Sequence, residues 1–187
     1  MDGGIYHVFN RGNDRRTLFS DGDDYQEFLD HLGQGLALHQ AALYHYCLMP
    51  NHFHLLLCIR AAGDLPTLMH RLQLAYARYF KKTRGFVGHV FQERFRSPRI
   101  PAESYYLQCG RYIERNPVAA KLVDEPAAYP YSSAAFYALG QPNARLTPNL
   151  YYEQMGTTPA VRQQRYREFL ALEEPYAALV DQGLVKV

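Results

Sequence analysis

The sequence predicts an α+β fold in which an antiparallel sheet carries helices on one face. Segments that alternate in polarity, as half-buried strands do, are interleaved with segments whose apolar residues recur every three to four positions, as in amphipathic helices. The order along the chain is strand, helix, strand, strand, helix, strand. This βαββαβ order is the ferredoxin-like pattern. The 187 residues are 48% hydrophobic and 20% charged, which is typical of a globular protein with a core.

The first hundred residues contain all six elements of this pattern. We expect strands at 5–10, 41–49, 52–60 and 96–100, and helices at about 21–38 and 64–84. In the first strand His7 points to the same side as Ile5 and Phe9. Pro50-Asn51 suits the centre of a tight turn, so the second and third strands form an antiparallel hairpin. Pro98 makes the fourth strand an edge strand or a broken one.

The remainder of the chain is predicted to be helical. We expect a helix at about 102–115, a short helix ending near Gly140, and polar amphipathic helices at roughly 159–172 and 175–182. Residues 1–140 are therefore interpreted as one domain, and residues 141–187 as a helical C-terminal extension.

Several classes of protein are disfavoured. No apolar run approaches 18 residues, so no membrane span is expected, and the first residues lack the features of a secretory signal. Cys47, Cys58 and Cys109 are widely spaced in apolar surroundings, which is typical of reduced core cysteines. We therefore expect a cytoplasmic protein.

Two histidines stand at the start of the third strand. His52 and His54 are two apart, so they project to the same side while Phe53 projects to the other. Two imidazoles on a rigid strand can form half of a metal site. A solvated strand end that happens to carry two histidines is the alternative.

A tyrosine and an asparagine could complete such a site. Tyr112 and Asn116 are four apart and share a face if both are helical. Two other interpretations stand beside this one. Tyr112 could be a core tyrosine, and Asn116 before Pro117 could be the N-cap of a new short helix through Lys121.

Basic residues are unevenly distributed. The segment from Leu65 to Arg99 contains eight basic residues and only one acidic residue, Glu93, although the net charge of the chain is only +2. Such segregation indicates a face for a polyanion, and a solvated helix face is the alternative. The residues expected to contact the polyanion form one set near the site and a second patch in an N-terminal loop: Arg94, Arg96, Arg99, Lys81, Lys82 and Arg84, and then Arg11, Arg15 and Arg16.

Four motifs, in order and without a large gap, resemble one family. They are YHVFNRGN at 6–13, LMPNHFHL at 48–55, RYIERNPV at 111–118 and YPYSS at 129–133. Together they resemble the single-tyrosine HUH transposases, and most closely the REP-associated tyrosine transposases. The resemblance covers about residues 4–140.

The resemblance implies a mechanism. It makes His52 and His54 the histidine pair, Tyr112 the nucleophile, and Asn116 the third, polar metal ligand where other members carry Gln. Mg²⁺ or Mn²⁺ would be the cofactor, since imidazoles favour Mn²⁺ and Mg²⁺ is abundant. A tyrosine hydroxyl, with an ordinary pKa near 10, needs activation by the metal, by Arg111 or Arg115, or by proton loss during attack. The partner would be single-stranded DNA next to a hairpin, and a homodimer is a further expectation.

The sequence thus predicts a metal-dependent DNA endonuclease and strand transferase that forms a 5′-phosphotyrosine. One alternative is a domesticated relative that binds DNA hairpins without cutting them. A metal-dependent hydrolase that uses water is the other.

Overall fold

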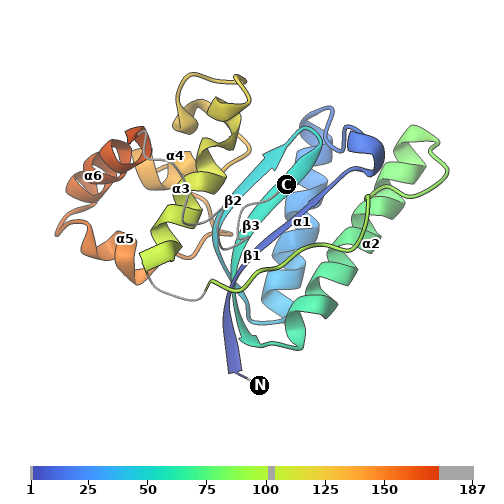
Figure 1. Ribbon diagram of the computed structural model, residues 1–187, viewed down its shortest axis with the longest axis horizontal. Coiled ribbons are helices and arrows are strands. Elements are labelled where there is room, and N and C mark those ends of the chain that lie inside the picture. Colours follow the sequence, from blue (N-terminus) through green and yellow to red (C-terminus); the bar gives the residue numbers. More distant parts are fainter. Residues whose placement is uncertain (1, 101–103, 173–187) are drawn as a thin grey trace.

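The computed structural model describes residues 2–100 and 104–172. At its centre lies a three-stranded antiparallel sheet in the order β1-β3-β2 (Figure 1). The strands are β1 (Asp2–Arg11), β2 (Ala42–Met49) and β3 (His52–Ala61). β2 and β3 form the predicted hairpin. Because β3 is the middle strand, its histidine-bearing start is held by hydrogen bonds on both sides.

One face of the sheet is covered by α1 (Gly22–Leu38) and α2 (Asp64–Arg84), both near their predicted bounds (Figure 1). Asp21 caps α1, since its side chain accepts a hydrogen bond from the Asp24 amide. The core on this side unites both helices with one face of the strands. Its members include Val8, Phe28, Leu32, Phe53, Leu55, Leu57, Leu68, Leu72 and Tyr76.

The opposite face of the sheet is covered by α3 (Ser104–Ala119). The expectation of helices on one face therefore holds for α1 and α2, while α3 lies across the sheet from them (Figure 1). A smaller core fixes α3 to the strands: Cys47, Met49, Leu56, Tyr106, Cys109 and Ile113. The first residues of the helix predicted at 102–115 lie outside the described residues, and α3 continues beyond the predicted end.

The predicted fourth strand is irregular. In place of a ladder, the segment 91–100 makes isolated antiparallel bridges to β1, at Phe9 with Arg96 and at Tyr6 with Arg99. Backbone hydrogen bonds between the same segments include the His7 amide to the Pro98 carbonyl, at 3.0 Å. Pro98 has no N–H to donate, which accounts for a broken edge rather than a regular strand.

The C-terminal part is helical. Apart from the 3₁₀ turn η1 (Asn13–Arg15), which follows β1, the remaining described elements are the 3₁₀ turn η2 (Pro126–Ala128) and three helices, α4 (Ala134–Leu139), α5 (Leu150–Gln154) and α6 (Pro159–Ala171). Tyr137, Tyr152, Tyr166 and Leu170 form their shared core. The helix predicted at 175–182 lies outside the described residues. Within the described ranges no helix has the length and apolarity to cross a membrane. The three cysteines are free, as predicted.

Candidate active site

The two histidines of β3 lie on the sheet face that α3 covers. His54 is paired in register with Phe9 of β1 and Cys47 of β2, and it is fully buried. His52 is partly buried at the strand's beginning, and its Nδ1 lies 2.7 Å from the Asn51 Oδ1. The two imidazole centroids are 5.1 Å apart. The alternation predicted from sequence therefore places both rings on one side of the sheet.

Helix α3 brings Tyr112 to the same place. The Tyr112 ring centroid is 5.5 Å from that of His54, with the rings edge to face. Tyr112 is partly buried, unlike the fully buried Ile113 that anchors α3 to the sheet. Residues almost sixty positions apart in the sequence are thus neighbours within one chain.

His7 of β1 is a further member of this cluster, which sequence reasoning did not assign to the site. Its Nε2 lies 2.9 Å from the Nδ1 of His54, and its ring centroid is 6.0 Å from that of Tyr112. His7 is fully buried. A signal was present, because alternation puts His7 on one face of its strand, but the pairing of β1 with β3 was needed to place it against His54.

Asn116 lies inside α3, so the alternative in which it caps a new helix is wrong. Pro117 lacks the N–H that would bond to the Ile113 carbonyl. The Asn116 Nδ2 compensates, donating to the Tyr112 carbonyl at 2.8 Å and to the Ile113 carbonyl at 3.3 Å. With its amide nitrogen so used, the side chain still interacts with His52 as a hydrogen-bond acceptor. The Asn116 side chain is thereby placed beside His52.

Burial keeps both histidines neutral. Loss of solvent lowers the pKa of His52 to about 4, opposed in part by the hydrogen bond with Asn116. Burial, and then the neighbouring imidazoles of His7 and His52, hold the pKa of His54 well below its usual range. A neutral imidazole offers a lone pair, which is the form that binds a metal.

The donor set fits a divalent cation. The Nε2 of His54 is buried and makes no hydrogen bond to any described residue, so this ring nitrogen is available to bind a cation. The His52 ring lies 5.1 Å from that of His54 between centroids, and the Asn116 side chain is a hydrogen-bonding neighbour of His52. Among residues 2–100 and 104–172, however, no group of three His, Cys, Asp or Glu side chains is arranged to hold a metal. A cation held by His52 and His54 would therefore need a third donor of another residue type, and Asn116 is the neighbouring amide.

The expected basic neighbours of Tyr112 face elsewhere. Arg111 is fully buried and donates to the Leu172 carbonyl, and Arg115 donates to the Leu170 carbonyl, both at the end of α6. Between them Glu114 accepts hydrogen bonds from Tyr166 of α6, at 2.7 Å, and from Ser133. The residues that flank Tyr112 thus join α3 to the C-terminal helices and stabilise the end of α6.

The predicted DNA-contacting residues fall into two groups. Some guanidiniums have protein partners: Arg84 pairs with the buried Asp24, Arg96 with Glu93, Arg99 with the Gly3 carbonyl, Arg11 with Gln92, and Arg16 stacks on Phe86. Arg15 and Arg94 have none within the described chain and are exposed, as are Lys81 and Lys82. Lys81 and Arg94 line one groove between α2 and the segment 88–94, with His70 and His89.

Comparison with known proteins decides the family. A family profile described as "Transposase IS200 like" matches residues 2–116, more than half of the chain. The chain belongs to the IS200-like transposase family. The match includes all of β1, β3 and the Tyr112–Asn116 turn of α3, so it contains every residue of the cluster described above. No protein of curated function matches this transposase family member.

Two solved structures are similar to this IS200-like chain. A REP-associated tyrosine transposase bound to a REP hairpin matches with a TM-score of 0.64 and 16% identity, covering 80% of this chain and 88% of that one. A proposed transposase from Deinococcus radiodurans R1 matches with a TM-score of 0.45 and 20% identity, covering 62% and 92%. The first similarity confirms the α+β fold. The resemblance seen in the sequence motifs is also confirmed.

Proposed function

We propose that this IS200-like chain is a metal-dependent DNA endonuclease and strand transferase that cuts single-stranded DNA beside a hairpin through a 5′-phosphotyrosine. The observation that carries the proposal is the approach of Tyr112 to His54 at 5.5 Å between ring centroids. A tyrosine nucleophile beside neutral imidazoles is an arrangement for phosphoryl transfer rather than for stabilising a core.

The chemical step is an in-line displacement at phosphorus. The Tyr112 oxygen loses its proton and forms a bond to the phosphorus as the bond to the 3′ oxygen breaks. That leaving oxygen takes up a proton and becomes a free 3′-hydroxyl. Because the phosphodiester energy is retained in the tyrosyl ester, a 3′-hydroxyl of another strand can attack it and rejoin the DNA. A hydrolase that uses water cannot perform this second step.

His52, His54 and Asn116 would hold Mg²⁺ or Mn²⁺. The bound cation would neutralise charge on a non-bridging phosphate oxygen and assist the leaving 3′ oxygen. The protein's own contribution is to keep both imidazoles neutral and to orient them. His7 orients His54, and the backbone-anchored amide of Asn116 orients its oxygen towards His52.

The substrate is proposed from charge and from the solved relative. In the groove that they line, Lys81 and Arg94 are exposed and have no acidic partner among the described residues, since Glu93 in the same groove pairs with Arg96. The segment bearing Arg96 and Arg99 continues along β1. Since the relative with a TM-score of 0.64 is bound to a REP hairpin, a hairpin-forming DNA is the proposed partner. Arg84 is left out of this surface because it is paired with buried Asp24.

The site needs no second chain. Tyr112 and both histidines approach one another within one chain, so we propose cleavage in cis. A homodimer stays a prediction. We also propose residues 1–140 as the transposase domain and 141–187 as its extension, bound to it through Tyr166 and Glu114.

A labelled hairpin oligonucleotide with single-stranded flanks tests the proposal. With Mn²⁺ the wild type should form a covalent protein–DNA complex that survives denaturation. Tyr112→Phe should bind the DNA and form none, while Tyr105→Phe on the same helix should still form it. Binding by the wild type without an adduct would favour the non-cleaving hairpin binder. Cleavage by Tyr112→Phe would favour a hydrolase.

A further inference from the structure

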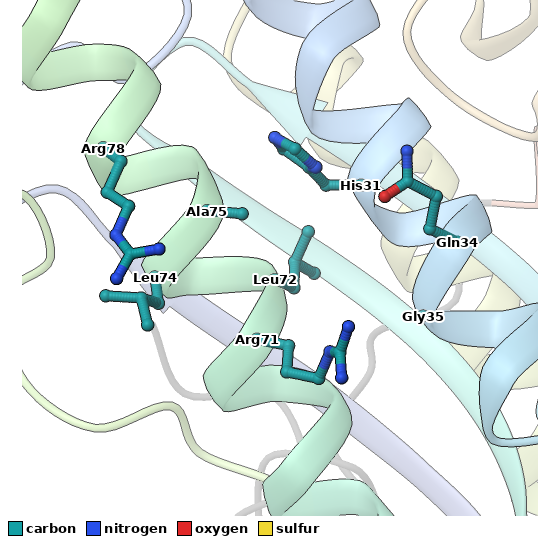
Figure 2. A pocket seen from close by; sticks show the side chains of 8 residues that line it. All are labelled: His31, Gln34, Gly35, Arg71, Leu72, Leu74, Ala75 and Arg78. Atoms are coloured by element: carbon teal, nitrogen blue, oxygen red, sulfur yellow. The ribbon is translucent and has the colours of Figure 1, made fainter.

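A groove separates the outer surfaces of α1 and α2, on the side of the sheet opposite to Tyr112. Its volume is about 290 Å³. Figure 2 shows His31 and Gln34 on α1 and Arg71 and Arg78 on α2, with Arg71 extending towards α1. None of these residues belongs to the site described above. The groove therefore has its own polar lining.

The groove exists because small residues lie where the helices meet. Gly35 of α1 has no side chain, and a Cβ there would come 3.3 Å from Leu68 of α2. Ala75 on α2 carries only a methyl group, and Leu72 is buried beneath. The helices thus approach closely, and the longer side chains of Arg71 and Gln34 are exposed at the edge of the groove.

The positive charges of this groove have no partner among the described residues. In the described part of the chain, four guanidiniums have no hydrogen bond, ion pair or aromatic partner: Arg15, Arg71, Arg78 and Arg94. Two of the four, Arg71 and Arg78, line this groove, and no acidic residue lines it with them. Glu27 lies nearby but pairs with His31, at 3.1 Å. Two like charges held on one helix without an acidic partner do not stabilise a fold.

We propose that the α1–α2 groove binds the phosphodiester backbone of a DNA segment other than the one being cut. The inference rests on the proposed function for its partner class, but not on the cleavage chemistry. Arg71 and Arg78 are seven residues apart on α2, about 10 Å along the helix. They are therefore placed to contact two separate phosphates, as a backbone lying along α2 would offer.

The lining chemistry matches this ligand. A guanidinium binds a phosphate through two parallel hydrogen bonds. The Gln34 amide adds a further donor from α1. Leu74, 41% exposed, lines both this groove and the groove that contains Lys81 and Arg94, so the two basic grooves adjoin along α2. DNA held near Arg94 can thus continue over α2 to Arg71.

The test compares charge removal inside and outside the groove. The double variant Arg71→Gln/Arg78→Gln is measured for DNA affinity at several salt concentrations. Arg60→Gln/Arg165→Gln is the matched control, because it removes the same charge from exposed sites elsewhere. Two contacts contribute about 1.8 to the logarithmic salt slope for duplex DNA and about 1.4 for single strands. We expect the groove variant to lose that slope and at least tenfold in affinity, and Arg71→Lys/Arg78→Lys to retain most of both.

Two probes identify the bound segment. A blunt hairpin and an unstructured single strand of equal length are compared, and whichever shows the groove-dependent slope is the segment bound. Equal losses in the groove variant and the control, with either probe, would overturn the proposal. Adduct formation by the wild type tests the cleavage proposal separately. If the wild type forms the adduct but the groove variant behaves like the control, only the groove proposal is refuted. If the groove variant loses affinity but the wild type forms no adduct, only the cleavage proposal is refuted.

Discussion

The Nε2 of His7 lies 2.9 Å from the Nδ1 of His54, joining β1 to β3 beside Tyr112. If the Nε2 of His54 binds a metal, its Nδ1 carries the proton and His7 accepts it. This hydrogen bond then fixes the tautomer and the ring orientation of His54. Such a role would account for the third histidine buried beside the pair.

Replacing His7 should weaken metal binding. His7→Leu removes the acceptor, and we expect the Mn²⁺ concentration for half-maximal DNA cleavage to rise about 10- to 100-fold. His7→Gln should retain most of the affinity, because its amide oxygen can accept the same proton. Titration of Mn²⁺ in the cleavage assay measures both. Equal behaviour of the two variants would show that His7 only fills space.

Stability should fall in mild acid. The pKa of His52 is about 4 in the folded chain and about 6.5 when unfolded, so the unfolded chain binds more protons between these values. The contribution of neutral His52 to the free energy of unfolding is complete above pH 6.5 and is lost as the pH falls through 4. For His52 this contribution amounts to about 3 kcal/mol. His54 acts in the same direction. Urea unfolding at pH 7 and pH 4.5 should show a smaller pH dependence for His52→Asn, and an unchanged dependence would contradict the burial argument.

Substitution of Arg84 should lower stability, whereas substitution of Arg94 should weaken DNA binding. Arg84→Met leaves the buried Asp24 without its cation, and we expect a loss of about 3 kcal/mol in the free energy of unfolding. Arg94→Gln should change stability by less than about 0.5 kcal/mol but lower the salt slope of DNA binding by roughly 0.7 to 0.9. Thermal melting and DNA titration separate the two effects. A stable Arg84→Met would refute the structural role of the pair.

Tyr166 should stabilise the contact between α6 and α3. Tyr166→Phe removes the donor to the buried Glu114 carboxylate, and we expect a loss of about 2 kcal/mol. Tyr6→Phe is the control, because the Tyr6 hydroxyl has no hydrogen bond to any described residue. Denaturant unfolding of both variants gives the comparison. Similar losses in the two would mean that Glu114 is satisfied without α6.

Local rules predicted part of this structure. Alternation placed His52 and His54 together, and helical spacing placed Tyr112 with Asn116. Pro98 predicted a broken edge. Other features depend on contacts distant in sequence. The pairing of His7 with His54 follows from strand register, and the Arg84–Asp24 pair from the packing of α1 against α2. Asn116 stays helical before Pro117 because its side chain replaces the missing N–H, which propensity alone does not reveal.

The most direct test of the account is to locate the covalent bond. Wild-type protein is incubated with Mn²⁺ and a labelled hairpin oligonucleotide, digested with protease, and analysed by mass spectrometry. The account predicts a nucleotide joined through its 5′ phosphate to Tyr112, together with a free 3′-hydroxyl on the released strand. Cleaved DNA carrying a free 5′ phosphate, or an adduct on a different residue, would contradict it.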